Sequence, residues 1–276
     1  MVDVGKITDG LSRSAEDIWV AGQKSSVSYP DNGNESVFQL EDDSFWFLHR
    51  NRVIEYFVSQ YSQGQPIFDI GGGNGCVSRW LQDKGMETVL LEPGLEGVRN
   101  ARSRGVTHII HSTFEAAQFR PEVIPAAGMF DVLEHVEKDG EFLTMLYSKM
   151  RPFGRLYLTV PAFDFLWSAE DDHAGHFRRY TLSQLRRTLE SVGFKVEFES
   201  YLFCFLVLPI WIFRSLPSRY GWRKDVRQAR TLKEHKSGRG FSSMLVNSLQ
   251  GWELKKVQMG QKIKLGSSCF VVAKRV

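Results

Sequence analysis

The sequence of 276 residues predicts a doubly wound α/β fold, on the evidence of one glycine-rich turn and of the strand and helix patterns around it. Residues 66–78 read PIFDIGGGNGCVS, in which a short apolar run breaks into glycines and then resumes with apolar residues at helical spacing. This pattern predicts a strand, a tight turn and a helix, the opening unit of an open parallel sheet. Glycine suits such a turn because it adopts positive φ and lets a ligand approach the backbone. The helix start that follows offers unpaired N–H groups.

The spacing of the glycines separates two classes of nucleotide site. The dinucleotide fingerprint G-x-G-x-x-G needs a third glycine at position 76, where this chain has Cys76. The glycines instead alternate through residues 71–75, two positions after Asp69. Glu92 ends the next apolar run, where an acid would bind ribose hydroxyls.

This pattern resembles the first motif of class I S-adenosylmethionine-dependent methyltransferases, an acid before G-x-G-x-G with a second acid after the next strand. The resemblance implies S-adenosyl-L-methionine as cofactor and S-adenosyl-L-homocysteine as product. It also implies a Rossmann-like, mostly parallel seven-stranded sheet whose last strand runs antiparallel beside the fifth. Asp69 and Cys76 disfavour a nicotinamide cofactor.

The amino-acid composition limits the class of protein to which the chain can belong and the compartment in which it is expected. Apolar residues make up 42% of the chain, enough for a packed core, and a net charge of +3 is too small to indicate nucleic acid as a partner. The three cysteines have no paired spacing, which favours free thiols in a reducing compartment. The first residues lack the apolar core of a signal peptide. We therefore expect a cytoplasmic protein.

The first 64 residues are expected to form a loose arm and a helical lid. Residues 1–40 are polar and rich in turn formers, so we expect an irregular arm. After an acidic helix start at residues 41–44, three consecutive aromatic residues precede Arg50 on a stretch with helical periodicity. This FWF-x-x-R stretch is also familiar ahead of the glycine turn in methyltransferases of this type. Simple packing on the main domain is one interpretation. The other is a lid, in which Phe47 attracts the sulfonium and Arg50 binds the methionine carboxylate.

Two further strand patterns follow the glycine turn, at residues 87–91 and 106–110. By their position in the family, Thr113 and Phe114 after the second of these strands flank the adenine ring. The family often has an acid here that binds the adenine amine, whereas this chain has Ser112 followed by Thr113. Whether that contact is made stays open.

A second motif, GMFDVLEHV, spans residues 128–136 and ends the fourth predicted strand. In an open sheet the ligand lies beyond the carboxyl ends of the central strands, so Phe130, Asp131 and His135 should border the methyl-transfer cleft. The motif resembles small-molecule methyltransferases of the broad type 11/12 group, which includes quinone- and glycan-modifying enzymes. The alternatives are helix capping by Asp131 and Glu134 and a structural role for His135.

A loop rich in polar side chains follows the fifth predicted strand. Residues 166–180 read LWSAEDDHAGHFRRY, and loops at this end of a sheet often carry function. They resemble the LWS-x-x-D-x-x-x-x-H-x-R-R-Y loop of a methyltransferase subgroup linked to bacterial surface glycans or lipids. We expect substrate binding and proton handling here, with a solvated loop as the alternative. The two histidines lack the fuller ligand set of a closed zinc site, so no metal is predicted.

The last quarter of the chain departs from the regular pattern. Residues 194–200 alternate as a sixth strand, and residues 267–274 form a final strand. Between them, residues 202–213 are almost all apolar but too short to span a bilayer as a helix. Basic residues then dominate as far as Arg239. One interpretation is a peripheral membrane contact through residues 202–239. The other is a buried helix followed by a solvated loop.

The chain is thus divided into an arm and lid (residues 1–64), an S-adenosylmethionine-binding core (65–200), and an insertion with the strand that completes the core sheet (201–276). The expected function is methyl transfer from S-adenosylmethionine to an O, N or C atom of a small molecule, a glycan or a lipid-linked acceptor. Most of the acceleration comes from alignment of the two ligands. A non-catalytic S-adenosylmethionine-binding or scaffold protein stays an alternative, and a nicotinamide-dependent oxidoreductase is a weaker one. The sequence indicates neither the acceptor nor the oligomeric state.

The candidate site residues fall into three groups. The cofactor-binding candidates are Phe47, Arg50, Asp69, Gly71, Gly72, Gly73, Gly75, Glu92, Thr113, Phe114, Phe130 and Asp131. The substrate-binding candidates are Trp167, Asp171, Arg178, Arg179 and Tyr180. The candidates for proton transfer are His135, His173 and His176, because histidine titrates near neutrality.

Overall fold

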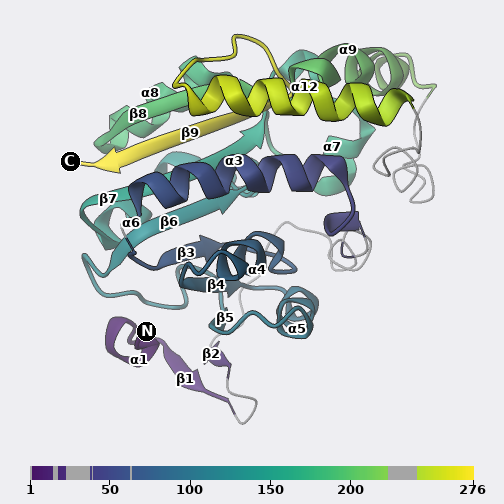
Figure 1. The fold of residues 1–276 in the computed structure, drawn as a ribbon. Coiled ribbons are helices and arrows are strands. Elements are labelled where there is room, and N and C mark those ends of the chain that lie inside the picture. The colour runs from purple at the N-terminus through teal and green to yellow at the C-terminus, as the bar shows by residue number, and fades with distance from the viewer. Residues whose placement is uncertain (1, 15–17, 23–37, 39, 63, 223–240) are drawn as a thin grey trace.

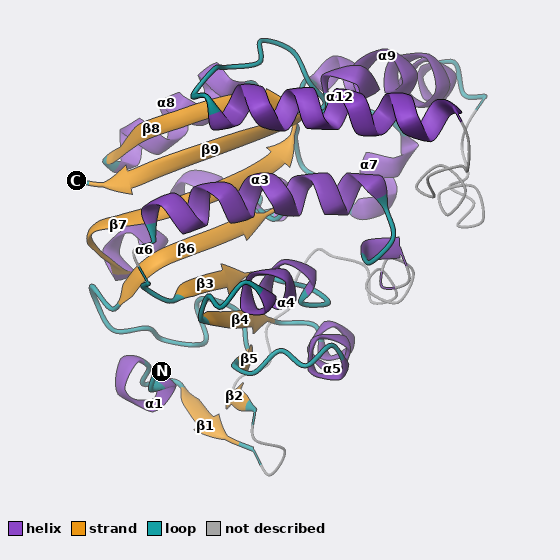
Figure 2. Cartoon of the chain, in the orientation of Figure 1, coloured by secondary structure: helices purple, strands orange, loops and turns teal. Residues whose placement is uncertain are grey.

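The structure, a computed structural model, describes residues 2–14, 18–22, 38, 40–62, 64–222 and 241–276. Within these ranges the strands form one nine-stranded sheet with helices on both faces (Figure 1 and Figure 2). The strands are β1 (Leu11–Arg13), β2 (Trp19–Ala21), β3 (Ile67–Ile70), β4 (Thr88–Glu92), β5 (Ile109–His111), β6 (Ile124–Phe130), β7 (Met150–Pro161), β8 (Phe194–Leu202) and β9 (Ser268–Arg275).

The strand order is β1-β2-β5-β4-β3-β6-β7-β9-β8. β3 pairs in parallel with β4 on one side and with β6 on the other, so the chain builds the sheet outward from β3 in both directions. An open sheet binds its ligand at such a reversal point, beyond the carboxyl ends of the strands. The predicted doubly wound, mostly parallel fold is confirmed.

The last strand, β9, runs antiparallel between β7 and β8. Its first six residues, 268–273, are all buried, because it is an interior strand covered on both faces. The antiparallel last strand expected beside the fifth is confirmed.

Helices cover both faces of the sheet (Figure 2). α3, α4 and α12 share a core on one face, and α6 and α8 share a core on the other. The helices are α1 (Val4–Ile7), α3 (Phe45–Tyr61), α4 (Cys76–Asp83), α5 (Leu95–Ser103), α6 (Asp139–Lys149), α7 (Ala169–Ala174), α8 (Leu182–Val192), α9 (Val207–Ile210), α10 (Leu216–Arg219) and α12 (Phe241–Gln258). Since both faces are covered, all four residues of β3 are buried, and Asp69 is the one polar side chain among them.

The N-terminal arm is more ordered than the sequence analysis expected. β1 and β2 pair with each other, and β2 pairs in parallel with β5 through Trp19 and Val20. These two strands extend the predicted seven-stranded sheet to nine. Each has three residues, which is too short for an alternating apolar pattern to be detected. Residues 23–37 of the expected arm lie outside the described residues.

The apolar segment after β8 folds into a series of short helices. A 3₁₀ turn at Cys204–Leu206 precedes α9, a π-helix at Trp211–Ser215 follows it, and α10 comes next. None of the helices in the described part of the chain is long and apolar enough to cross a membrane. The basic residues predicted beyond Trp222, as far as Arg239, fall outside the described residues.

Helix α12 was not predicted from the sequence. Its buried positions include Gln250 and Glu253, whereas Met244, Leu245 and Trp252 are 69%, 54% and 48% exposed. Gln250 and Glu253 thus share the buried face with Val257, while several apolar side chains are exposed to solvent, so the helix lacks the usual amphipathic pattern. This mixed pattern explains why the helix was not predicted.

Glu253 joins α12 to the rest of the fold. Its carboxylate accepts hydrogen bonds from the backbone N–H of Phe203 at 2.7 Å and of Cys204 at 3.1 Å, and lies 2.8 Å from Nε2 of His49 on α3. The side chain is fully buried, so it ties together α3, α12 and the turn after β8.

We predict that Glu253→Ala lowers the free energy of unfolding by about 3 kcal/mol, because it leaves three buried donors without their acceptor. Urea denaturation measures this change. Glu141→Ala, at an exposed carboxylate on α6, is the matched control and should change stability by less than about 0.5 kcal/mol. Equal stability of the two variants would contradict the structural role of Glu253.

Candidate active site

A cavity of about 1360 Å³ lies beyond the carboxyl ends of β3, β4, β6 and β7. It exceeds the roughly 300–1,000 Å³ of a typical small-molecule site, so it has room for two ligands. The structure places most of the predicted cofactor-binding residues on its wall. These are Phe47, Arg50, Asp69, Gly71, Gly72, Gly73, Glu92, Thr113, Phe114, Phe130 and Asp131.

The glycine turn presents bare backbone to this cavity. Gly71, Gly73 and Gly75 have φ angles of +69°, +53° and +74°, a region that strains other residues. A Cβ at Gly71 would lie 2.9 Å from Val132, and one at Gly72 would lie 2.8 Å from a carboxylate oxygen. Gly75 is the N-cap of α4 and does not line the cavity. The turn therefore needs glycine for its conformation and for close approach.

Two buried acids flank the turn. Glu92 accepts hydrogen bonds from the backbone N–H of Gly73 at 2.9 Å and of Gly94 at 2.7 Å, yet burial raises its pKa to about 7. Asp69 accepts a hydrogen bond from the Ser78 hydroxyl at 2.7 Å, and burial raises its pKa to about 6. A ligand that supplies hydroxyl or ammonium donors would stabilise the ionised form of both acids.

Arg50 of α3 lines the cavity but also has protein partners. Its guanidinium forms an ion pair with Asp131 and lies 4.9 Å from the ring centroid of Trp46 and 5.1 Å from that of Phe47. Asp131 directly follows β6 and has a φ of +59°, an uncommon conformation that occurs often at functional sites. The Asp131 carboxylate is thus the ion-pair partner of Arg50, whereas the sequence analysis expected Arg50 to bind the methionine carboxylate of the cofactor. The Nε atom of Arg50 is buried and has no hydrogen-bond partner among the described residues, so one donor stays available to a ligand.

Thr113 and Phe114 lie on the wall after β5. The Phe114 ring packs against Phe119 and Phe142, with centroids 5.3 and 5.5 Å away, and is 4% exposed. The Thr113 hydroxyl oxygen accepts a hydrogen bond from the backbone N–H of Ala116 at 3.3 Å. Both residues thus border the cavity from fixed positions, and their contact with adenine stays a prediction.

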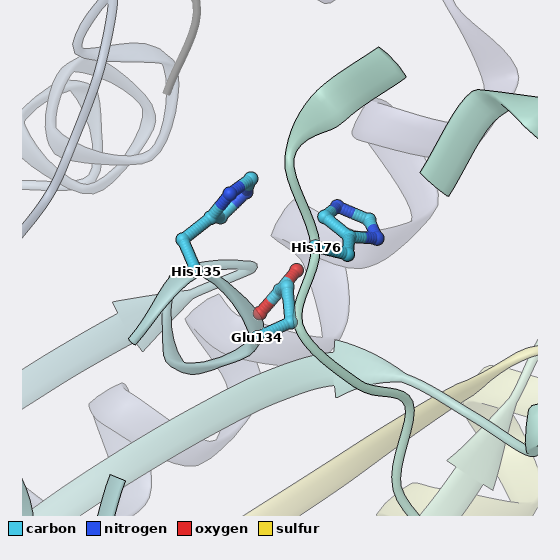
Figure 3. Close-up of side chains that lie close together, drawn as sticks. All are labelled: Glu134, His135 and His176. Atoms are coloured by element: carbon cyan, nitrogen blue, oxygen red, sulfur yellow. The ribbon is translucent and has the colours of Figure 1, made fainter. Parts of the chain in front are cut away.

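A cluster of three side chains, Glu134, His135 and His176, lines another part of the wall (Figure 3). Each offers an oxygen or nitrogen atom that lies within 4.8 Å of the other two. Burial raises the pKa of Glu134 well above its usual range, and the nearby Asp131 carboxylate adds to this effect. Burial, and then the neighbouring His176, lower the pKa of His135 to about 4, so His135 is neutral at pH 7.

Asp171 holds the 166–180 loop in place. Its oxygens accept hydrogen bonds from Nε of Arg179 at 2.8 Å and from Nη2 of Arg179 at 2.9 Å, and Oδ1 lies 2.8 Å from Nδ1 of His176. Burial alone would raise the pKa of Asp171, but His176 and Arg179 outweigh it and lower the pKa to about 2. Asp171, His176 and Arg179 are the predicted residues of this loop that line the cavity.

Four residues predicted to bind substrate or transfer protons do not line the cavity. They are Trp167, His173, Arg178 and Tyr180. Arg178 and Tyr180 instead bind the carboxylate of Asp139 at the start of α6, at 3.1 and 2.9 Å. His173 is exposed on α7. The structure therefore places only some of the predicted residues of this loop at the cavity, and Arg178 and Tyr180 bind within the protein instead.

Two parts of the wall lie outside the predicted site residues, although the sequence had left open whether residues 202–239 form a membrane anchor or part of the substrate site. Glu134 was interpreted as a helix-capping acid, but Leu133–His135 is a single 3₁₀ turn and the side chain is fully buried at the cavity. The apolar segment after β8 also contributes to the wall. Its lining residues are Leu206, Pro209, Ile210, Phe213 and Arg214. The only signal for them in the sequence was an apolar run too short to span a bilayer.

The reversal at β3, the glycine turn and the buried acid that ends β4 define a nucleotide-binding α/β protein whose site has room for a second ligand. Residues 46–198, more than half of the chain, match the family model described as a methyltransferase domain, and the chain belongs to this family. The family uses S-adenosylmethionine as its methyl donor, and the glycine turn, the two acids and the available Arg50 donor fit such a cofactor. The predicted class of protein and its cofactor are confirmed.

Two curated relatives resemble the chain. A Mycolicibacterium smegmatis protein named "Probable S-adenosylmethionine-dependent methyltransferase" is 22% identical over 171 residues, which cover 61% of this chain and 66% of that protein. The mitochondrial ubiquinone biosynthesis O-methyltransferase of Schizosaccharomyces pombe is 30% identical over 105 residues, which cover 35% of this chain and 38% of that protein. The chain thus spans less than two thirds of the length of each relative.

Solved structures share the fold. Phosphoethanolamine N-methyltransferase 2 of Haemonchus contortus, solved with S-adenosylhomocysteine, has a TM-score of 0.54 and 14% identity, with 90% of this chain and 58% of that chain covered. At this level of identity the likeness shows the fold alone.

We predict that S-adenosylhomocysteine binds about tenfold more weakly near pH 6 than near pH 8. Burial raises the pKa of Glu92 to about 7 in the free protein, and the ionised carboxylate accepts hydrogen bonds from ribose more strongly than the protonated group, so affinity rises as pH increases through this value and then levels off. Calorimetric titration across this range measures the change.

Glu92→Gln is the control for this pH dependence. It should bind more weakly at every pH and keep only the dependence that Asp69 produces near its own pKa of about 6. A Glu92→Gln variant with the pH profile of the unmodified protein would show that Glu92 does not bind the ribose.

Proposed function

We propose that this chain transfers a methyl group from S-adenosylmethionine to an O, N or C atom of an amphiphilic, lipid-linked acceptor. The observation that carries the proposal is the mixed lining of the cavity. Its wall includes the glycine turn and Glu92 and also apolar residues between Leu206 and Phe213. A polar site for a cofactor and an apolar wall for a second ligand thus belong to one cavity.

The chain's own residues would position the two ligands. When bound, S-adenosylmethionine supplies a methyl group activated by a cationic sulfonium. Gly71–Gly73 and Asp69 would hold its methionine end, Glu92 its ribose, and the rings of Trp46 and Phe47 lie beside the same space. Fixing two reactants in this way accounts for most of the acceleration expected of such a site.

His135 and His176 would face the acceptor. Because the pKa of His135 is lowered to about 4 by burial and by its neighbour, its imidazole is neutral and can accept a hydrogen bond from an acceptor hydroxyl. The S. pombe relative is named an O-methyltransferase, which favours oxygen as the acceptor atom. His173, exposed on α7, has no part in this proposal.

An exposed apolar surface adjoins the acceptor end of the cavity. Leu208, Ile212 and Phe213 are 65%, 45% and 62% exposed, and Tyr220 and Trp222 further along are 67% and 81% exposed. Phe213 also lines the cavity, so this surface and the acceptor wall belong to one segment. Apolar and aromatic residues beside cations such as Arg219 are typical of an interfacial membrane contact.

Hydrogen bonds hold this segment against the 166–180 loop. The Ser215 hydroxyl donates to the carbonyl of Leu166 at 2.8 Å, and the Ser218 hydroxyl accepts from the backbone N–H of Ala169 at 3.1 Å. The proposed membrane contact therefore has a fixed position relative to the acceptor site. A cytoplasmic protein that docks on the membrane face fits this arrangement, and nucleic acid has no role in it.

We predict methyl transfer to lipid-linked hydroxyl compounds in vesicles, with little transfer to water-soluble analogues that lack the apolar chain. The assay incubates the purified chain with methyl-labelled S-adenosylmethionine and follows label in the lipid phase together with release of S-adenosylhomocysteine. Asp69→Ala is the control that removes cofactor binding. Tight binding of S-adenosylhomocysteine without transfer to any acceptor would instead support a non-catalytic S-adenosylmethionine-binding protein.

We also predict that the double variant Leu208→Ser, Ile212→Ser weakens binding to anionic vesicles by at least about tenfold, because each removes an apolar side chain from the contact. Vesicle co-sedimentation measures this binding. Phe153→Ser is the matched control, since Phe153 is 65% exposed near the start of β7, away from the carboxyl ends of the strands. Equal loss in both variants would show that the contact is not specific to the 208–222 surface.

A further inference from the structure

Glu134 is a buried carboxylate that lacks the partners such a group needs. Its side chain is fully buried, and neither oxygen has a hydrogen-bond partner in another residue that the structure describes. Two acids nearby are matched with arginines: Asp131 pairs with Arg50, and Asp171 pairs with Arg179. The ionised form of a carboxyl group buried without a partner is costly, so a ligand that carries positive charge would stabilise it.

Two imidazoles lie next to this carboxylate. Figure 3 shows Glu134 between His135 and His176, and one donor atom from each of the three residues lies within 4.8 Å of the others. The rings of the two histidines are 4.7 Å apart and nearly perpendicular. One carboxylate and two imidazoles at this separation match the ligand set of a divalent transition metal.

We propose that Glu134, His135 and His176 bind a divalent transition-metal ion, such as Zn²⁺, in the wall of the cavity. Imidazole favours zinc and its neighbours over Mg²⁺ or Ca²⁺, which prefer oxygen ligands. Because three protein ligands do not complete a tetrahedral shell, at least one position stays open toward the cavity.

The surroundings orient the histidines as metal ligands require. The Nδ1 atom of His176 lies 2.8 Å from the Asp171 carboxylate, which leaves Nε2 with its lone pair for a metal. This is the carboxylate–histidine–metal arrangement found around metal centres. Asp171 is itself held by Arg179, so the orientation of His176 is fixed before any ion arrives. His135 interacts in turn with the backbone of Gly175.

The role of the ion rests on the proposed function. An acceptor hydroxyl at the open position would lose its proton to solvent more readily, because a bound cation stabilises the oxygen anion. The new O–CH₃ bond then forms as the S–CH₃ bond breaks, and the electron pair of the broken bond stays on sulfur. With a metal bound, His135 and His176 act as ligands and not as bases.

The test uses the full chain, freed of metal by a chelator and then titrated with Zn²⁺ by calorimetry and with Co²⁺ by visible absorption. We expect about one ion per chain and Co²⁺ bands typical of nitrogen and oxygen ligands. Glu134→Gln and His176→Gln should weaken binding by at least about a hundredfold, and Asp171→Asn by about tenfold through the loss of orientation. His108→Gln, at a histidine that directly precedes β5 and lies beside Glu87, should leave metal binding unchanged.

The affinity for S-adenosylhomocysteine, measured on the same samples, separates a lost metal site from a misfolded protein. A chain that binds S-adenosylhomocysteine but no metal ion overturns the metal site and leaves methyl transfer standing. Metal binding that survives in both Glu134→Gln and His176→Gln overturns the assignment of ligands. Methyl transfer at an equal rate in the chelated enzyme overturns the role of the ion, whereas metal binding without any transfer overturns the proposed function alone.

Discussion

The reversal of strand order at β3 is the constraint on which the site depends. Because β4 and β6 pair with β3 in parallel, all three strands end at the same edge, and the connections that leave them diverge. The glycine turn, Glu92 and Asp131 follow these three strands, so the topology alone brings them to one crevice. The strand order therefore places these acids in the interior of the protein, where the burial of a charged side chain costs free energy.

Those acids differ in how the fold accommodates them. Asp171 is stabilised as an ion by Arg179 and His176, and its pKa falls to about 2 in spite of burial. Among the described residues, Glu92 accepts from backbone donors alone, so burial prevails and its pKa rises to about 7. The first arrangement stabilises a loop within the protein. The second leaves the Glu92 carboxyl group to be stabilised in its ionised form by a bound ligand, and groups with such shifted pKa values are typical of functional sites.

Local patterns were predictable from the sequence, and contacts between distant segments were not. The strand, glycine turn and acid around Gly71 are adjacent in the chain, and Glu92 follows at a set distance, so their chemistry could be read directly. The contact between Glu134 and His176 joins two loops, and the ion pair of Arg50 with Asp131 joins a helix to a strand end. Helix α12 was hidden for another reason: its fold-facing residue Glu253 is polar and satisfied by distant donors.

The position of β9 affects how the protein folds during its synthesis. Among the described strands, β8 pairs with β9 alone, and β9 pairs with β7 on its other side. During synthesis β7 and β8 emerge before β9, so Tyr157 and Phe198 lack Val272, the residue that pairs with both, until residues 268–275 leave the ribosome. An open strand edge with apolar faces is a template for misassembly. Between the translation of β8 and of β9, the nascent chain therefore carries an unpaired strand edge that the finished fold closes.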